Sequence, residues 1–155
     1  MDKRAFHKGL ALSYKKKFPE MFHDYKGKCD RGEVTPGQPY LWENDKVQIL
    51  NFPTKRHWNQ NSILSDIENG LKYLSENYAR MEISSLALPP LGCGLGGLDW
   101  AKIKALIEKY FGPIEDLDVY VYEKQDILSL PEDEEKTTDK KSVKSKGLAA
   151  RPSLF

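Results

Sequence analysis

Four glycines lie close together in the stretch Leu86-Ala-Leu-Pro-Pro-Leu-Gly-Cys-Gly-Leu-Gly-Gly-Leu-Asp-Trp100, after a short apolar run. Gly92, Gly94, Gly96 and Gly97 allow the backbone to take positive φ angles and to approach a ligand closely. The N–H groups at the start of the helix expected after this loop favour an anion. The stretch therefore predicts a loop that cradles the phosphate of a ligand.

The same loop has other interpretations. The spacing Gly92-x-Gly94-x-x-Gly97 matches the fingerprint of redox dinucleotide-binding domains, with Glu123 as a candidate ribose-binding acid. In such domains the fingerprint follows its strand directly, whereas here Pro89 and Pro90 stand between the strand and the glycines, which disfavours this interpretation. A Walker loop fits less well, because no Gly-Lys-Ser/Thr sequence closes the glycines. A tight structural turn without any ligand is the remaining alternative.

Two further motifs accompany the glycines: Asn51-Phe-Pro-Thr-Lys-Arg-His-Trp58 and Lys8-Gly-Leu-Ala-Leu-Ser-Tyr-Lys-Lys-Lys-Phe-Pro19. Together the three motifs resemble a macrodomain, and specifically the DarG-type branch that removes ADP-ribose from DNA. The resemblance covers approximately residues 6–123, in the family's order of helices and strands. It implies an α/β fold of three layers, α/β/α, around a mixed central sheet.

The resemblance also implies an active site. Lys55 corresponds to the catalytic lysine, which acts at the anomeric carbon of the ribose that carries the modified group. Such a lysine attacks only as a neutral amine, a form that burial or a nearby cation such as Arg56 or Lys8 would favour. The alternative is a surface lysine in a turn. The expected substrate-binding residues are Lys8, Gly9, Thr54, His57, Trp58, Pro90, Leu91, Gly92, Cys93, Gly94, Leu95, Gly96 and Gly97.

Some of these residues have a second interpretation. Trp58 and His57 could stack against a DNA base, or they could be a core anchor and its hydrogen-bonded neighbour. Cys93 is expected to pack as a small side chain rather than to act as a nucleophile. With only Cys29 besides, the chain predicts neither a metal site nor a disulfide, and no cofactor is expected.

The match does not include the family's opening strands, its Gly-Asp-Ile/Leu segment or its asparagine-rich loop. The chain starts within the first ligand loop, where His7 stands in place of a glycine. We therefore expect unpaired sheet edges, which could pair with a second copy or borrow a strand. Gly96 stands where some relatives have an aspartate, so Lys55 would act alone.

Composition predicts one domain. The chain has 155 residues, of which 39% are hydrophobic and 30% charged, with a net charge of +1. Residues 1–128 are expected to form the macrodomain-like unit, and residues 129–155, which lose all periodicity, a disordered tail. Because the net charge is so small, contacts with DNA must come from a local patch. The candidates are Lys15, Lys16, Lys17, Lys55 and Arg56, and the alternative is that these residues form a solvated face. No run is apolar enough for a membrane span or signal, which predicts a cytoplasmic protein.

Apolar spacing predicts the elements that must position these residues. They are a helical segment to about Lys28 that restarts at Pro19, strands over 39–42 and 47–51, a helix from an N-cap at Ser62 to about Arg80, a strand over 84–88, a helix over 100–111 and a strand over 117–122.

Three functions are compatible with the sequence. The first is a glycohydrolase that removes ADP-ribose from single-stranded DNA, as the antitoxin of a DNA ADP-ribosyltransferase toxin. The second is a non-catalytic module that binds ADP-ribose or the toxin, and the third is an inactive remnant of a longer gene.

Overall fold

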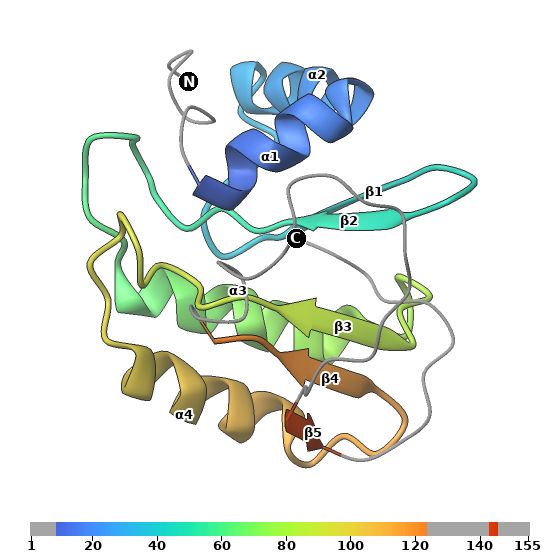
Figure 1. Cartoon of the computed structure of the whole chain (residues 1–155), viewed down its shortest axis with the longest axis vertical. Coiled ribbons are helices and arrows are strands. Elements are labelled where there is room, and N and C mark those ends of the chain that lie inside the picture. The colour runs from blue at the N-terminus through green and yellow to red at the C-terminus, as the bar shows by residue number, and fades with distance from the viewer. Residues whose placement is uncertain (1–8, 124–142, 146–155) are drawn as a thin grey trace.

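The structure is a computed structural model that describes residues 9–123 and the backbone of residues 143–145. Its elements follow the order α1 (Gly9–Lys17), α2 (Pro19–Asp30), β1 (Tyr40–Glu43), β2 (Gln48–Asn51), α3 (Leu64–Asn77), β3 (Ser85–Leu88), α4 (Trp100–Phe111), β4 (Asp118–Val121) and β5 (Val143–Ser145) (Figure 1). Lys8 and the predicted tail, apart from β5, lie outside the described residues. The domain boundary at residue 128 therefore stays a prediction, and β5 is a strand that it did not include.

The strands form two separate ladders. β1 and β2 make an antiparallel hairpin in which Tyr40 lies opposite Asn51. β3 and β4 are parallel, with α4 as the crossover between them, and β5 is antiparallel to β4. The mixed pairing is as expected, but β2 and β3 do not pair with each other among the described residues. β2 and β3 thus each keep one edge without a described strand partner, in agreement with the expectation of unpaired sheet edges.

Burial along β2 shows that helices cover both faces of the strands. Ile49 packs with Met21 and Tyr25 of α2, whereas Leu50 belongs to the larger cluster formed by α3, α4, β3 and β4. Successive side chains of a strand point to opposite faces, so these two residues mark two helical layers with β2 between them. The predicted three-layer α/β/α arrangement is confirmed.

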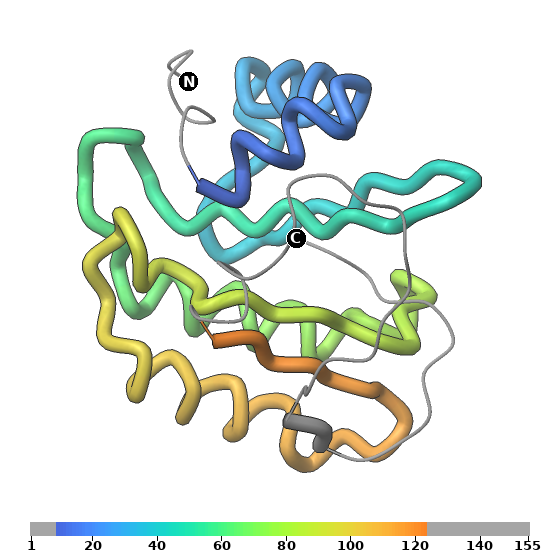
Figure 2. The backbone as a smooth tube through the Cα atoms, viewed as in Figure 1, coloured from blue at the N-terminus to red at the C-terminus, as the bar shows by residue number. Residues whose placement is uncertain are grey.

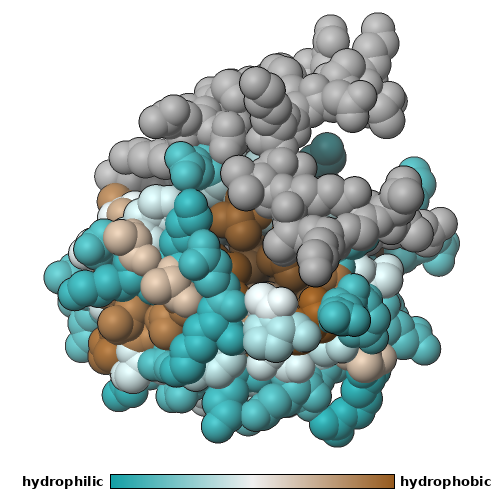
Figure 3. Space-filling view, turned by 90° about the horizontal axis from the view of Figure 1, so that it is seen from below, coloured by the Kyte–Doolittle hydropathy of each residue, from teal (hydrophilic) through white to brown (hydrophobic). Residues whose placement is uncertain are grey.

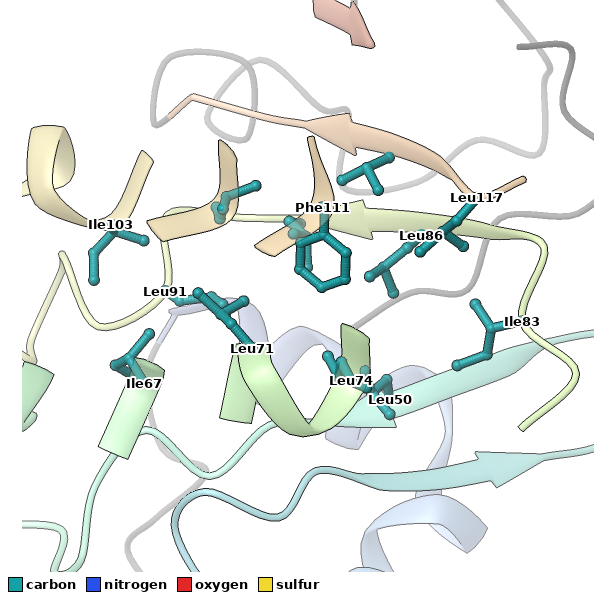
Figure 4. Packing of buried hydrophobic residues seen from close by; sticks show 13 residues of the cluster. Leu50, Ile67, Leu71, Leu74, Ile83, Leu86, Leu91, Ile103, Phe111 and Leu117 are labelled. Carbon is teal, nitrogen blue, oxygen red and sulfur yellow. The ribbon is translucent and has the colours of Figure 1, made fainter. Parts of the chain in front are cut away.

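The larger cluster is the main core (Figure 4). Leu71 and Leu74 of α3 face Ile103 and Phe111 of α4, with Leu86 of β3 beside them, and none of these side chains is more than 4% exposed. Full burial of such a side chain contributes roughly 1.5–3 kcal/mol to folding. This core fixes α3 and α4, and therefore the loops that precede both helices.

The structure tests two details of the predicted elements. The predicted restart at Pro19 is confirmed, because α2 begins there and the missing N–H of proline costs nothing in the first turn of a helix. The prediction of an N-cap at Ser62 is wrong, because Ile63 holds that position without a side-chain hydrogen bond. The Ser62 N–H donates instead to the carbonyl of Gly96 at 3.0 Å.

The outer face of α4 is polar. Lys102, Lys104 and Glu108 are exposed there, opposite the buried Ile103 and Ile107. The surface viewed from below is accordingly hydrophilic over much of its area, with hydrophobic regions between the polar ones (Figure 3). Within the described residues, no helix has the length and apolar character needed to span a membrane.

Candidate active site

Two loops on the same side of the molecule contain the predicted site. The Lys55 loop, residues 52–62, follows β2, and the glycine loop, residues 89–99, follows β3; both run along the left of Figure 2. Lys55 Nζ donates a hydrogen bond of 2.9 Å to the carbonyl oxygen of Leu95, 40 residues further along the chain. The Ser62 N–H bonded to Gly96 makes a second link. The structure therefore brings together two motifs that the sequence could only name separately.

The glycine loop is held in a compact form by its own backbone. The N–H of Cys93 donates to Pro90 O at 3.2 Å, and the N–H of Leu98 donates to Gly92 O at 3.0 Å. Of the four predicted glycines, only Gly92 and Gly97 have positive φ, at 70° and 75°. These two positions use the conformational freedom for which glycine is needed.

Gly96 is required for a different reason, which is space. A Cβ atom at this position would lie 2.2 Å from Ser62 Oγ and 2.3 Å from the carbonyl oxygen of Gly92. Ser62 is only 6% exposed, and its Oγ has no hydrogen-bond partner within the described part of the chain. By contrast, a Cβ at Gly94 would meet nothing within 4 Å.

Backbone N–H groups at the tip of the glycine loop are available to an anion. Within residues 9–123, no hydrogen bond engages the N–H groups of Gly94, Leu95 and Gly96. Gly94 and Leu95 are also exposed, and the Leu95 side chain is 70% accessible. Consecutive free N–H groups of this kind form anion-binding concavities.

The start of α4 is less suited to an anion than the sequence predicted. Asp99 caps this helix, and its carboxylate accepts a hydrogen bond of 3.0 Å from the N–H of Ala101. The negative charge of Asp99 already occupies the electropositive end of the helix. The start of α4 is therefore a weaker anion site than the tip of the glycine loop.

Arg56, next to Lys55, is bound to α3. Its Nε and a terminal guanidinium nitrogen donate to the two carboxylate oxygens of Asp66 at 2.8 and 2.9 Å. The Asp66 side chain is 6% exposed, whereas that of Arg56 is 60% exposed. The hydrogen bond from Arg56 holds the pKa of the Asp66 carboxyl below its ordinary value, against the opposite effect of burial. Arg56 was considered as a cation that favours neutral Lys55, but its charge is compensated by Asp66.

The other predicted residues of the Lys55 loop lie around the lysine. Thr54 and Trp58 are half-buried, and His57 is exposed. His57 Nδ1 lies 2.6 Å from Asn59 Oδ1, and its ring centroid is 6.0 Å from that of Trp58. Their role as substrate contacts stays a prediction.

The remaining predicted residues divide into core and surface positions. Leu91 is 4% exposed and belongs to the main core, and the half-buried Cys93 packs against it. Burial raises the pKa of the Cys93 thiol, as does the charge of Asp99. Gly9 begins α1 with a φ of 67°, and no described hydrogen bond joins it to either loop.

Sequence reasoning missed two residues near this site. Asn51 ends β2, is 8% exposed, and its Nδ2 has no partner among the described residues. An amide at the end of an otherwise apolar strand is a signal that could have drawn attention to it. Asp66 gave no such signal, because an acid in the first turn of a helix is common. In the described ranges, no three His, Cys, Asp or Glu side chains gather as a metal site.

The layers, the mixed strand pairing and the two joined loops define an α/β domain with a compact glycine loop beside a lysine. The sequence profile of the macro domain family matches residues 3–107. The chain belongs to the macro domain family.

Two relatives are close to this chain. The DNA ADP-ribosyl glycohydrolase of Mycobacterium tuberculosis is 40% identical over 119 residues, which are 74% of this chain and 34% of the relative. The solved macrodomain of M. tuberculosis DarG superimposes with a TM-score of 0.71, over 74% of this chain and 78% of that one.

The second relative is a Thermosipho africanus DNA ADP-ribosyl transferase-DNA ADP-ribosyl glycohydrolase fusion protein, 37% identical over 134 residues, which are 74% of this chain and 34% of the relative. The structure of T. africanus DarTG in complex with ADP-ribose superimposes with a TM-score of 0.70 at 38% identity, over 75% of this chain and 34% of that one. The chain thus spans about a third of the length of these curated relatives.

Proposed function

We propose that this chain is an ADP-ribosyl glycohydrolase that removes ADP-ribose from modified single-stranded DNA, with Lys55 as its catalytic residue. The names of both relatives support the reaction, and the T. africanus complex supports ADP-ribose as the ligand. The observation that carries the proposal is the position of Lys55 Nζ, 2.9 Å from the backbone of the glycine loop.

This position suits nucleophilic attack beside a bound phosphate. The free N–H groups of Gly94 and Leu95 would hold the pyrophosphate of ADP-ribose at the tip of the glycine loop. A neutral amine at Lys55 can donate one N–H to Leu95 O while its lone pair points elsewhere. The ligand and the nucleophile would thus be placed by the same loop, which lowers the entropic cost of reaching the reactive geometry.

The reaction would proceed in two steps. The lone pair of Lys55 Nζ forms a bond to the anomeric carbon of the ribose, and the bond from that carbon to the DNA base breaks. The base keeps the electron pair of the broken bond and takes up the proton that Lys55 Nζ loses as it becomes a secondary amine. Water then replaces the lysine at the sugar, which releases ADP-ribose and regenerates the amine.

Release of ADP-ribose from an ADP-ribosylated single-stranded oligonucleotide tests the proposal. We expect turnover by the wild-type chain and a loss of roughly 10³-fold or more in Lys55→Ala, as for removal of other catalytic nucleophiles. Lys46→Ala is the matched control, because Lys46 is an exposed lysine in the β1–β2 turn and its loss removes the same charge. This control should keep wild-type activity.

Two results would contradict the proposal. Undiminished turnover in Lys55→Ala would remove the catalytic role of this lysine. Absence of turnover in a folded wild-type chain would remove the hydrolase itself. A chain whose melting temperature still rises with ADP-ribose would then be a binding module, and one without that response would be an inactive remnant.

The proposed partners follow from the same relatives. Modified DNA is the substrate, and a DNA ADP-ribosyltransferase toxin is the source of the modification, since one relative joins both activities in one chain. A substrate of this kind would place the activity in the cytoplasm. Copurification of the chain with such a toxin would test the partnership.

A further inference from the structure

We propose that the ion pair between Arg56 and Asp66 is a positioning device that holds Lys55 Nζ at the glycine loop. The expected effect on turnover rests on the proposed function, whereas the expected effect on the mobility of the Lys55 loop rests on the structure alone. Arg56 and Asp66 are positioning residues here, because neither is required to touch the substrate.

The Lys55 loop is anchored along one face of α3. Before Lys55, the ring of Phe52 lies over Gly70, where a Cβ atom would come within 2.3 Å of Phe52 Cζ. After Lys55, Arg56 binds Asp66 through two hydrogen bonds. Positions 66 and 70 are four residues apart and therefore neighbours on the helix surface. Lys55 is thus held between two contacts with a single rigid element.

The geometry of the ion pair is suited to fixing a direction as well as a distance. A guanidinium that donates two parallel hydrogen bonds to a carboxylate is held in one plane, which a lysine ammonium cannot reproduce. Asp66 adds rigidity, since it is buried in the first turn of α3 and its negative charge is favoured at a helix N-terminus. The bond from Lys55 Nζ to Leu95 O then connects this fixed loop to the glycine loop.

Another explanation for Arg56 is contact with the phosphates of DNA, since its side chain is 60% exposed. The two roles make opposite kinetic predictions. Loss of a phosphate contact weakens substrate binding and raises KM, whereas loss of positioning lowers kcat at similar KM. Asp66 separates the two roles further. Its side chain is only 6% exposed and carries a negative charge, so it cannot bind a DNA phosphate.

The kinetic experiment compares Arg56→Gln, Arg56→Lys, Asp66→Asn and the double variant Arg56→Gln/Asp66→Asn on the modified oligonucleotide. We expect kcat to fall by about 10- to 100-fold in Arg56→Gln and in Asp66→Asn, with KM within about threefold, since a misplacement of 1 Å can cost a factor of 10². Arg56→Lys should recover part of kcat. The double variant should be no slower than either single one, because both remove the same interaction.

Lys109→Gln is the matched control. Lys109 on α4 forms an ion pair with Glu68 on α3 at 2.9 Å, with the same exposure of the basic side chain as Arg56. Its loss removes an ion pair with the same helix but away from the Lys55 loop. We expect wild-type kcat and KM in this variant.

Hydrogen exchange of the backbone amides in residues 54–60 supplies a readout that needs no turnover. We expect faster exchange of these amides in Arg56→Gln and Asp66→Asn than in the wild type or Lys109→Gln. Unchanged exchange in both variants would overturn the proposal, as would a selective rise of KM that Arg56→Lys restores. A wild-type chain without turnover would refute the proposed function, and the exchange rates would still decide whether the ion pair holds the loop.

Discussion

The compact form of the glycine loop depends on the absence of a side chain at Gly96. In Gly96→Ala the new methyl group would lie 2.2 Å from Ser62 Oγ and 2.3 Å from Gly92 O. The serine hydroxyl can rotate away, but the carbonyl oxygen moves only if the loop backbone moves. Overpacking of this kind costs about 1–3 kcal/mol. At roughly 3 °C per kcal/mol for a chain of this size, the melting temperature should fall by about 3–9 °C.

The control is Gly94→Ala, two residues earlier in the same loop. A Cβ atom at Gly94 meets nothing within 4 Å, and its φ lies outside the left-handed region. Its stability should be unchanged or higher by up to about 1 kcal/mol, because alanine restricts the unfolded chain. Urea unfolding of the wild type and both variants gives the two free-energy differences directly.

A second comparison separates the two atoms that crowd Gly96. Adding Ser62→Ala to Gly96→Ala removes the hydroxyl but leaves the carbonyl oxygen of Gly92, so most of the loss should persist. Equal stability of Gly96→Ala and Gly94→Ala would refute the packing described for the loop. Full restoration by Ser62→Ala would show that the backbone carbonyl was no obstacle.

Two further predictions concern the contacts of α3. In Gly70→Ala, the gain of about 1 kcal/mol in helix propensity opposes an overpacking cost of about 1–3 kcal/mol against the ring of Phe52, so thermal unfolding should show a net loss of up to about 2 kcal/mol. The same change in a Phe52→Ala background should instead stabilise the chain. Because the folded pKa of Asp66 is lowered, its ionised form stabilises the fold above the ordinary aspartate pKa of 3.8, and this stability is lost as pH falls through the folded value. Asp66→Asn should therefore destabilise the chain at pH 7, and its deficit relative to the wild type should shrink as the pH falls below about 4. A deficit independent of pH would contradict the role of the charge.

Helices and strands with a strong apolar pattern could be predicted, whereas β5 was not predicted. The helix over residues 100–111 places Ile103 and Ile107 on one face, and the structure gives α4 with the same bounds and the same buried face. The adjacent residues Ile49 and Leu50 are both apolar and both buried, as is typical of a strand that is covered on both faces. Local sequence determines such elements almost completely.

Contacts between loops could not be predicted in the same way. Ser62 has the side chain of an N-cap, but its backbone N–H is bonded to Gly96, which moves the cap to Ile63. The partner of Arg56 was also not evident, because the pairing depends on how the Lys55 loop turns back onto α3. At Ser62 a tertiary contact outweighs a local capping preference worth about 1 kcal/mol, and at Arg56 the tertiary contact has no local signal.

The positions of the two loops relative to each other have a particular origin in this chain. β2 and β3 share no ladder among the described residues, so strand pairing does not determine the distance between Lys55 and the glycine loop. That distance is determined by Leu50, which joins β2 to the main core, and by the contacts of the Lys55 loop with α3 and with Leu95. In a continuous sheet, strand pairing would hold the two loops in place. Here side-chain contacts hold them, so substitutions at Arg56 or Asp66 should affect activity more than the exposure of these residues or their distance from the substrate would indicate.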